Sequence, residues 1–230
     1  MSGVYAKAEG ITLVGGGELT AQTLERALER APRLVAADGG ADRALALGHR
    51  PDLVIGDLDS LSDQLRADLG PERLHHIETQ DNTDFDKAIA VIHAPFILAV
   101  GFSGARLDHT LAAMNTLTRN PERRVIVDTG HDLCVLLPPS LDMPITEGSR
   151  VSLFPMAPVG CTSEGLTWSI DGLPFAPTGK IGTSNMASAG RLRLTADAPA
   201  MLLLLPVSEI DALISAVLRA PVWPADARGR

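Results

Sequence analysis

The sequence has little cysteine, few aromatic residues and no long apolar run. Its two cysteines, Cys134 and Cys161, are too few for a disulfide framework or a thiolate metal cage, so both are expected to be core thiols. The longest apolar run, residues 201–206, is far shorter than the roughly 18 residues of a membrane helix. The amino terminus also lacks the residue order of a secretory signal, and a cytoplasmic protein is therefore expected.

Positive charge is also scarce, because 20 basic side chains stand against 28 acidic ones and give a formal charge of −8. A surface that coats nucleic acid needs the opposite balance, so no nucleic-acid partner and no membrane partner is expected. Hydrophobic residues make up 45% of the 230 residues and charged residues only 21%, which favours a folded chain with a substantial core.

The first 137 residues alternate short aliphatic runs with helical spacing. The runs predict buried strands at residues 11–14, 33–37, 53–55, 96–100 and 125–127. Apolar residues recur at helical intervals over 24–31, 85–92 and 107–114. Alternating strands and helices predict an α/β amino-terminal domain, residues 1–137, with a mostly parallel sheet.

The pattern changes near Pro138 and Pro139. Short runs at 151–154, 166–170, 191–194 and 200–205 are broken by glycine and proline and show little helical spacing. They predict an all-β sandwich as the carboxy-terminal domain, residues 142–206. The extension 207–230 is expected to be helical over 208–218, with Ser208 and Asp211 in capping-box spacing, and then irregular.

Aspartates follow several of the predicted strands. Asp38 and the pair Asp57 and Asp59 come directly after strands, Asp108 lies just beyond another, and Asp81 and Asp84 lie at a predicted helix start. Because ligands bind at the carboxyl ends of strands in an open parallel sheet, these acids are expected to share one edge of the fold. Two carboxylates about 5 Å apart repel by roughly 3 kcal/mol at an effective dielectric near 20. A magnesium ion (Mg²⁺) with substrate phosphates would remove that repulsion.

Each of these residues also has a purely structural interpretation. An aspartate after a strand commonly caps a helix or forms a turn. Thr83 and Asp86 have the spacing of a capping box, and His109 beside Asp108 is expected to be structural. The repetition of acids at several strand ends is what favours a metal site formed by some of them.

Neighbouring residues suit a phosphate. Gly15–Gly17 follows the first strand and could present backbone amides to an anion, although a plain turn fits equally well. Lys87 lies three residues after Asp84 on the same helix face, unless it is merely a solvated lysine. Arg106 could clamp a phosphate with its planar guanidinium.

These segments, taken in order, resemble the thiamine pyrophosphokinase family, whose members transfer pyrophosphate from ATP to thiamine. The resemblance covers about residues 11–205 and rests on six segments: 37–41, 51–60, 81–88, 104–109, 165–168 and 183–185. Single motifs are weak, but their order along the chain is specific. Two features depart from the family: Ala105 replaces the second glycine of a Gly-Gly-Arg run, and the chain continues through 208–230.

The resemblance implies an ATP- and metal-binding first domain, a thiamine-binding second domain, and a homodimer whose active sites are shared between subunits. It implies that Asp57, Asp59 and Asp84 hold Mg²⁺. It places the nucleotide and phosphates among Asp38, Gly39, Asp81, Thr83, Lys87, Arg106 and Asp108. It brings Ser184 and Asn185 to the aminopyrimidine and offers the ring of Trp168 to thiamine.

Alternatives remain for the last three residues and for the activity. Trp168 also fits a sandwich core, and Ser184–Asn185 also fits an ordinary turn. A different metal-dependent phosphatase or nucleotidyltransferase could use the same acidic edge. A thiamine or nucleotide sensor without catalytic activity could use the acids only as helix caps.

Overall fold

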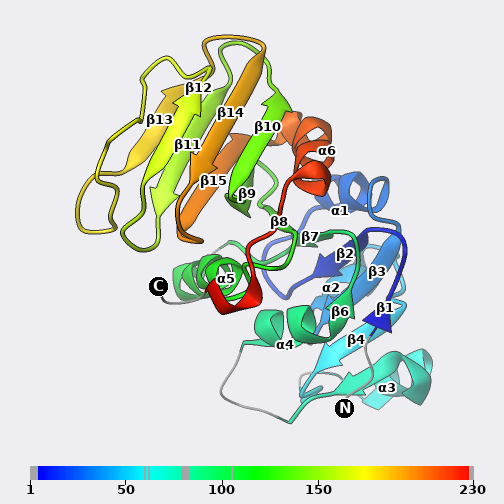
Figure 1. The fold of residues 1–230 in the computed structure, drawn as a ribbon. Coiled ribbons are helices and arrows are strands. Elements are labelled where there is room, and N and C mark those ends of the chain that lie inside the picture. Colours follow the sequence, from blue (N-terminus) through cyan, green and yellow to red (C-terminus); the bar gives the residue numbers. More distant parts are fainter. Residues whose placement is uncertain (1–4, 60, 62, 79–82, 105, 228–230) are drawn as a thin grey trace. The chain divides into compact units, whose positions relative to one another are not determined.

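The computed structural model describes residues 5–59, 61, 63–78, 83–104 and 106–227 (Figure 1). The chain divides into two compact units. The first comprises Met1–Thr116 with Val127–Gly130, and the second comprises Leu117–Ile126 with His131–Arg230. Across the described ranges, no helix is both long enough and apolar enough to span a membrane.

Parallel strands form the framework of the first unit. β3 (Arg33–Ala37), β4 (Leu53–Gly56) and β5 (Leu74–His76) pair in parallel, as do β2 (Ile11–Val14) with β7 (Ile97–Val100). β1 (Tyr5–Ala6) and β6 (Ile92–His93) form another parallel pair. Every residue of β2 and β7 is buried, as expected for strands covered on both faces. The predicted strands of this unit are confirmed.

Helices separate these strands along the chain. The three predicted helical stripes correspond to α1 (Ala21–Leu28), α4 (Asp84–Val91) and α5 (Leu107–Arg119). The sequence did not predict α2 (Gly40–Ala46), α3 (Asp63–Leu69) or the 3₁₀ turn η1 (Pro71–Arg73). β8 (Val125–Asp128) and α5 each contribute residues to both units.

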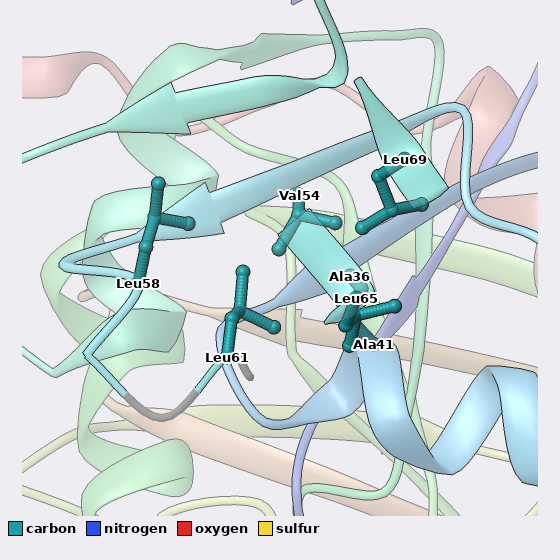
Figure 2. Packing of buried hydrophobic residues seen from close by; sticks show 7 residues of the cluster. All are labelled: Ala36, Ala41, Val54, Leu58, Leu61, Leu65 and Leu69. Atoms are coloured by element: carbon teal, nitrogen blue, oxygen red, sulfur yellow. The ribbon is translucent and has the colours of Figure 1, made fainter. Parts of the chain in front are cut away.

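A small apolar cluster fixes the segment that follows β4 (Figure 2). Ala36 of β3 and Val54 of β4 pack with Ala41 of α2. The cluster is completed by leucines from the β4–α3 connection and from α3, which are Leu58, Leu61, Leu65 and Leu69. Leu58 is only 5% exposed, so the loop directly after β4 is anchored in the core.

The second unit is antiparallel. Four consecutive strands of a larger sheet have the order β13 (Gly182–Met186), β11 (Arg150–Pro155), β15 (Met201–Pro206) and β9 (Asp132–Leu136). A separate three-stranded sheet has the order β10 (Ser140–Pro144), β14 (Arg191–Ala196) and β12 (Cys161–Glu164). β10 and β14 alternate buried and exposed residues, which is the pattern of sheets with one covered face. The expected fold class is confirmed: a mostly parallel α/β part followed by a β-sandwich part.

Two local predictions in the second unit are wrong. Residues 166–170 form no strand and contribute only an isolated bridge between Leu166 and Ala187. The capping box of Ser208 and Asp211 is also absent, because the 3₁₀ turn η2 (Val207–Glu209) leads into α6 (Ile210–Arg219), whose N-cap residue is Glu209. After α6 the described chain ends with the 3₁₀ turn η3 (Ala225–Ala227). Cys134 and Cys161 are buried thiols, as expected.

Replacing Leu69 with alanine should lower the free energy of unfolding by about 2–5 kcal/mol, because a leucine that is 1% exposed leaves a cavity behind. Urea unfolding followed by circular dichroism measures the change. The control Leu111→Ala, at a side chain that is 58% exposed, should change the stability by less than about 0.5 kcal/mol. Equal losses in the two variants would contradict the assignment of Leu69 to the core.

Candidate active site

The parallel strands of the first unit end level with one another. Val14 pairs with Val100, Ala37 with Ile55, and Gly56 with His76. The residues that follow these ends therefore leave the sheet at the same edge, where open parallel sheets bind ligands. Asp38 follows β3 and Asp57 follows β4, so two of the predicted acids lie at this edge.

The backbone around these acids is strained. Asp38 has a φ of 41° and Leu58 a φ of 63°, which are unusual values for residues with side chains. Such conformations persist only where the surrounding structure holds them, and they cluster at functional sites. In the β4–α3 loop that support comes from the buried Leu58 side chain and from Arg66.

Arg66 fixes the loop between Asp57 and α3. Its Nη2 donates to the carbonyl of Leu58 at 2.5 Å and its Nε donates to the carbonyl of Leu61 at 3.3 Å. Sequence reasoning missed this residue, because an arginine inside a helical segment has no distinguishing pattern. Asp59 is exposed, and its backbone N–H donates to Oδ1 of Asp57 at 3.3 Å.

Lys87 joins two of the predicted acids. Its Nζ donates to Oδ1 of Asp84 at 3.0 Å and to Oδ2 of Asp57 at 3.1 Å. The lysine side chain is only 3% exposed, so the interpretation of Lys87 as a solvated surface residue is wrong. The two carboxylates remain 36% and 41% exposed and thus accessible to a ligand.

The start of α4 places Asp84 and Lys87. Thr83 is the N-cap residue, and its Oγ1 accepts from the backbone N–H of Asp86 at 3.2 Å. The same hydroxyl donates to Oδ2 of Asp86 at 2.8 Å. The predicted capping pair is therefore confirmed. Because Thr83 fixes the first turn, Asp84 and Lys87 lie one turn apart on one helix face.

The pKa values in this group reflect the shared ammonium. The hydrogen bond from Lys87, assisted by the backbone N–H of Asp59, holds the pKa of Asp57 below its ordinary value of 3.8. Burial by itself would lower the pKa of Lys87, but its hydrogen bonds to Asp84 and Asp57 outweigh burial and raise the pKa above 10.5. Lys87 is therefore an ammonium, and Asp57 a carboxylate, at neutral pH.

A cavity of about 670 Å³ opens beside this group. Its lining includes five of the predicted site residues: Asp38, Gly39, Thr83, Asp84 and Arg106. The rings of Phe85 and Phe102, also in the lining, stack with their centroids 4.1 Å apart. The sequence predicted Phe85 as part of an apolar helix face, and it is buried as expected, whereas Phe102 was missed and the cavity-lining His109 was taken as structural.

The glycine segment 15–17 also lines the cavity, but two of its amides are engaged within the protein. Gly15 N–H donates to the carbonyl of Val100 at 2.8 Å, and Gly17 N–H donates to the carbonyl of Gly101 at 2.7 Å. A Cβ on Gly17 would lie 2.6 Å from the carbonyl oxygen of Ser103, so this close approach needs glycine. The segment packs two loops together rather than offering those amides to an anion.

Two other predicted site residues do not belong to the Lys87 group: Asp108 lies apart from it, and Asp81 lies outside the described residues. Asp108 is exposed and pairs with Arg106, whose Nη2 lies 2.6 Å from Asp108 Oδ2. Asp81 and Ala105 lie outside the described residues. Within the described part of the chain, no three histidine, cysteine or acidic side chains are grouped closely enough to hold a metal ion. Asp57 and Asp84 therefore come together without Asp59.

The second unit contains the remaining three predicted residues. Trp168 is 59% exposed, so its interpretation as a sandwich-core residue is wrong. Ser184 is exposed, with a φ of 62°, and its N–H donates to Oγ of Ser152 at 3.0 Å. Asn185 is buried, and its side chain contacts the backbone of Trp168 and Met186.

Comparisons with known proteins agree with the two units. A family model described as "Thiamin pyrophosphokinase, catalytic domain" matches residues 24–127, and one described as "Thiamin pyrophosphokinase, vitamin B1 binding domain" matches residues 136–201. Thiamine pyrophosphokinase 1 of Arabidopsis thaliana is 30% identical over 203 residues, covering 74% of this chain and 76% of the plant protein. The rice protein of the same name is 29% identical over 203 residues, and the match covers 74% of this chain and 77% of the rice protein.

Solved structures share the fold. Thiamine pyrophosphokinase from Bacillus subtilis matches with a TM-score of 0.69 and 20% identity, covering 86% of this chain and 98% of that chain. The yeast thiamin pyrophosphokinase matches with a TM-score of 0.72 and 18% identity, covering 91% of this chain and 89% of that chain. At these identities the structures establish the fold, while the plant relatives and the two family models establish the kinship. The chain belongs to the thiamin pyrophosphokinase family.

Proposed function

We propose that this chain transfers the pyrophosphoryl group of ATP to the primary hydroxyl of thiamine, producing thiamine diphosphate and AMP. The hydroxyl oxygen forms a bond to the β-phosphorus, the bond from that phosphorus to the bridging oxygen of the α-phosphate breaks, and AMP carries that oxygen away. The observation that carries the proposal is the buried Lys87 ammonium between two accessible carboxylates, next to a cavity of nucleotide size. Reactions of this kind depend mainly on alignment and charge neutralisation.

The cavity supports ATP as the co-substrate. Arg106 and Arg43 in its lining offer cationic groups to phosphates, and the ring of Phe102, supported from behind by the buried Phe85, offers an apolar surface to a base. Asp38 and Gly39 at the end of β3 extend the same lining. Lys87 holds Asp57 and Asp84 in fixed positions, which prepares the charged edge before substrate arrives.

The residues present fit a magnesium ion with few protein ligands. Mg²⁺ usually takes one or two carboxylates together with waters and substrate phosphates, and Asp57 and Asp84 supply two partly exposed carboxylates linked through one ammonium. When bound, the ion would neutralise charge on the phosphate oxygens. Asp59 is exposed directly after the anchored Leu58 and would contact the ion through a bridging water. The residue that accepts the proton of the hydroxyl is unassigned.

The second unit offers a surface for thiamine. Trp168 is one of two tryptophans in a chain with few aromatic residues, and its ring is largely exposed. Thiamine carries a cationic ring, and a tryptophan face attracts a cation by roughly 0.5–2 kcal/mol. Ser184 directly precedes Asn185, whose side chain hydrogen-bonds the backbone of Trp168. Ser184 is exposed, and its hydroxyl would be a further group for thiamine.

We also propose that the chain works as a homodimer in the cytoplasm, with each active site formed by the first unit of one subunit and the second unit of its partner. The family resemblance supports this arrangement. A shared active site also explains why the residues proposed to bind ATP and those proposed to bind thiamine lie in different units of one chain.

Incubation of the purified protein with ATP, Mg²⁺ and thiamine should yield AMP and thiamine diphosphate by mass spectrometry. The variant Asp57→Asn should lose at least about a hundredfold in turnover while its circular dichroism stays unchanged, because it removes a carboxylate that would hold the Mg²⁺ needed to neutralise the substrate phosphates. Near-normal AMP release by this variant at saturating Mg²⁺ would refute the assignment of Asp57. Inorganic phosphate or a nucleotidyl adduct as product would indicate the phosphatase or nucleotidyltransferase alternative, and binding without turnover would indicate a sensor.

The variant Lys87→Met should lower the thermal midpoint at neutral pH by several degrees, since it leaves two neighbouring carboxylates without their shared cation. The raised pKa of Lys87 means that its stabilising effect is complete below pH 10.5 and is lost as pH rises through the folded value. The lowered pKa of Asp57 means that its effect is complete above pH 3.8 and is lost as pH falls through the folded value.

The difference in thermal midpoint between wild type and Lys87→Met should therefore be largest between about pH 3.8 and pH 10.5. It should shrink at lower pH, as Asp57 is protonated, and at higher pH, as Lys87 loses its charge. Differential scanning fluorimetry across pH measures it. A difference that does not vary with pH would show that Lys87 stabilises the fold by packing alone.

Mixed dimers should test the shared active site. Asp84→Asn and Trp168→Ala each impair one contributing unit, so a heterodimer would have one doubly altered site and one intact site. Random pairing makes half of the dimers mixed, and about a quarter of wild-type activity should return. Co-expression with two affinity tags supplies the mixture, and each variant alone supplies the baseline. No recovery in isolated heterodimers would place both contributions in one subunit.

A further inference from the structure

Trp168 lies in a connection that has little regular structure of its own. Between β12, which ends at Glu164, and β13, which begins at Gly182, the described chain contains no helix and no strand, only isolated bridges. Thr167 N–H donates to the carbonyl of Met186 at 2.8 Å, and Ser188 N–H donates to the carbonyl of Gly165 at 2.9 Å. An exposed ring in such a segment can serve as a binding surface only if its backbone is fixed.

The side chain of Asn185 fixes the backbone of Trp168. Its Nδ2 donates to the carbonyl of Trp168 at 2.7 Å, and its Oδ1 accepts from the N–H of Trp168 at 3.2 Å. Oδ1 also accepts from the N–H of Met186 at 2.8 Å. An amide side chain can make four hydrogen bonds, and three of those of Asn185 are used on backbone groups.

The position of Asn185 in β13 explains how its side chain reaches Trp168. The pairing of β13 with β11 shifts register between Val151 and Leu153, and Ser184 at this irregularity has a φ of 62°. Bulges of this kind change the direction of the following side chain. The Asn185 side chain is 7% exposed, so its hydrogen bonds form away from competing water.

We propose that Asn185 is a positioning residue, which holds Trp168 so that the exposed ring forms the thiamine surface. This inference rests on the proposed function and gives Asn185 a role different from the direct substrate contact that the family resemblance implied. The Trp168 ring touches the substrate, and Asn185 acts through it. An amide suits this role because one side chain must both donate to a carbonyl and accept from an N–H.

The test combines kinetics with Trp168 fluorescence. Asn185→Ala should raise KM for thiamine about tenfold or more, as expected for a displaced contact, while KM for ATP changes by less than about twofold. In a Trp223→Phe background, where Trp168 is the sole tryptophan, the same variant should lower fluorescence anisotropy and increase quenching by iodide. Asn185→Asp, which keeps the acceptor but loses the donor, should shift both readouts in the same direction and remains usable if the alanine variant does not fold.

Ser149→Ala is a matched control. Its hydroxyl donates to the buried Glu209 at 2.6 Å in the same unit, so the variant loses a partly buried hydrogen bond without altering the Asn185–Trp168 contacts. It should lower thermal stability while leaving KM for thiamine and Trp168 anisotropy unchanged. Equal kinetic effects in the Ser149 and Asn185 variants would overturn the proposal, because general destabilisation would then explain both.

A double variant separates positioning from direct contact. If Asn185 acts through Trp168, adding Asn185→Ala to Trp168→Ala should raise KM for thiamine by less than about twofold further, since coupled residues are non-additive. Multiplicative effects would show that Asn185 contacts thiamine itself and would overturn the proposal, as would unchanged anisotropy in Asn185→Ala. Absence of thiamine diphosphate formation by wild type would instead refute the proposed function, whereas the anisotropy measurement needs no turnover.

Discussion

The first unit depends on a buried ammonium that links two carboxylates from separate parts of the chain. Asp57 follows β4 and Asp84 begins α4, and without Lys87 their charges would repel at the edge where the sheet ends. Because the lysine is inside and both carboxylates are partly exposed, the positive charge faces the protein and the carboxylates are accessible from solvent. The structure thus holds two accessible carboxylates in fixed positions at the edge where the parallel strands end.

Apolar packing and local hydrogen bonds keep this edge in place. Leu58 lies between Asp57 and Asp59 in the sequence and is buried in the cluster that α2 and α3 share with the sheet. Arg66 donates hydrogen bonds to the carbonyls of Leu58 and Leu61, and Thr83 caps the first turn of α4. In the second unit Asn185 plays a comparable part for the exposed Trp168. In each unit, local hydrogen bonds fix the backbone next to an accessible side chain that the family resemblance singled out.

Residues in left-handed backbone conformations coincide with the sequence motifs. Among the described residues other than glycine, only Asp38, Leu58 and Ser184 have positive φ values, and each belongs to a segment that carried the family resemblance. Strain of this kind costs free energy and is retained where a side chain must point in a particular direction. Each of these three motifs therefore contains a residue with an unusual backbone conformation in addition to the side chains that suggested a function.

Local patterns in the sequence predicted the strands β2, β3, β4 and β7 and the helices α1, α4 and α5, because burial and helical spacing are properties of neighbouring residues. Of the acids expected at one sheet edge, Asp38 and Asp57 follow parallel strands there and Asp84 shares Lys87 with Asp57, whereas Asp108 lies apart. The polar strands β12 and β13 and the short helices α2 and α3 were missed, since tertiary pairing and packing stabilise them. Only the tertiary structure decided that Lys87 is buried between Asp57 and Asp84, that two amides of the glycine segment are engaged, and that Asn185 holds Trp168. Those contacts join residues from separate elements, and no local pattern specifies which partners the folded chain will bring together.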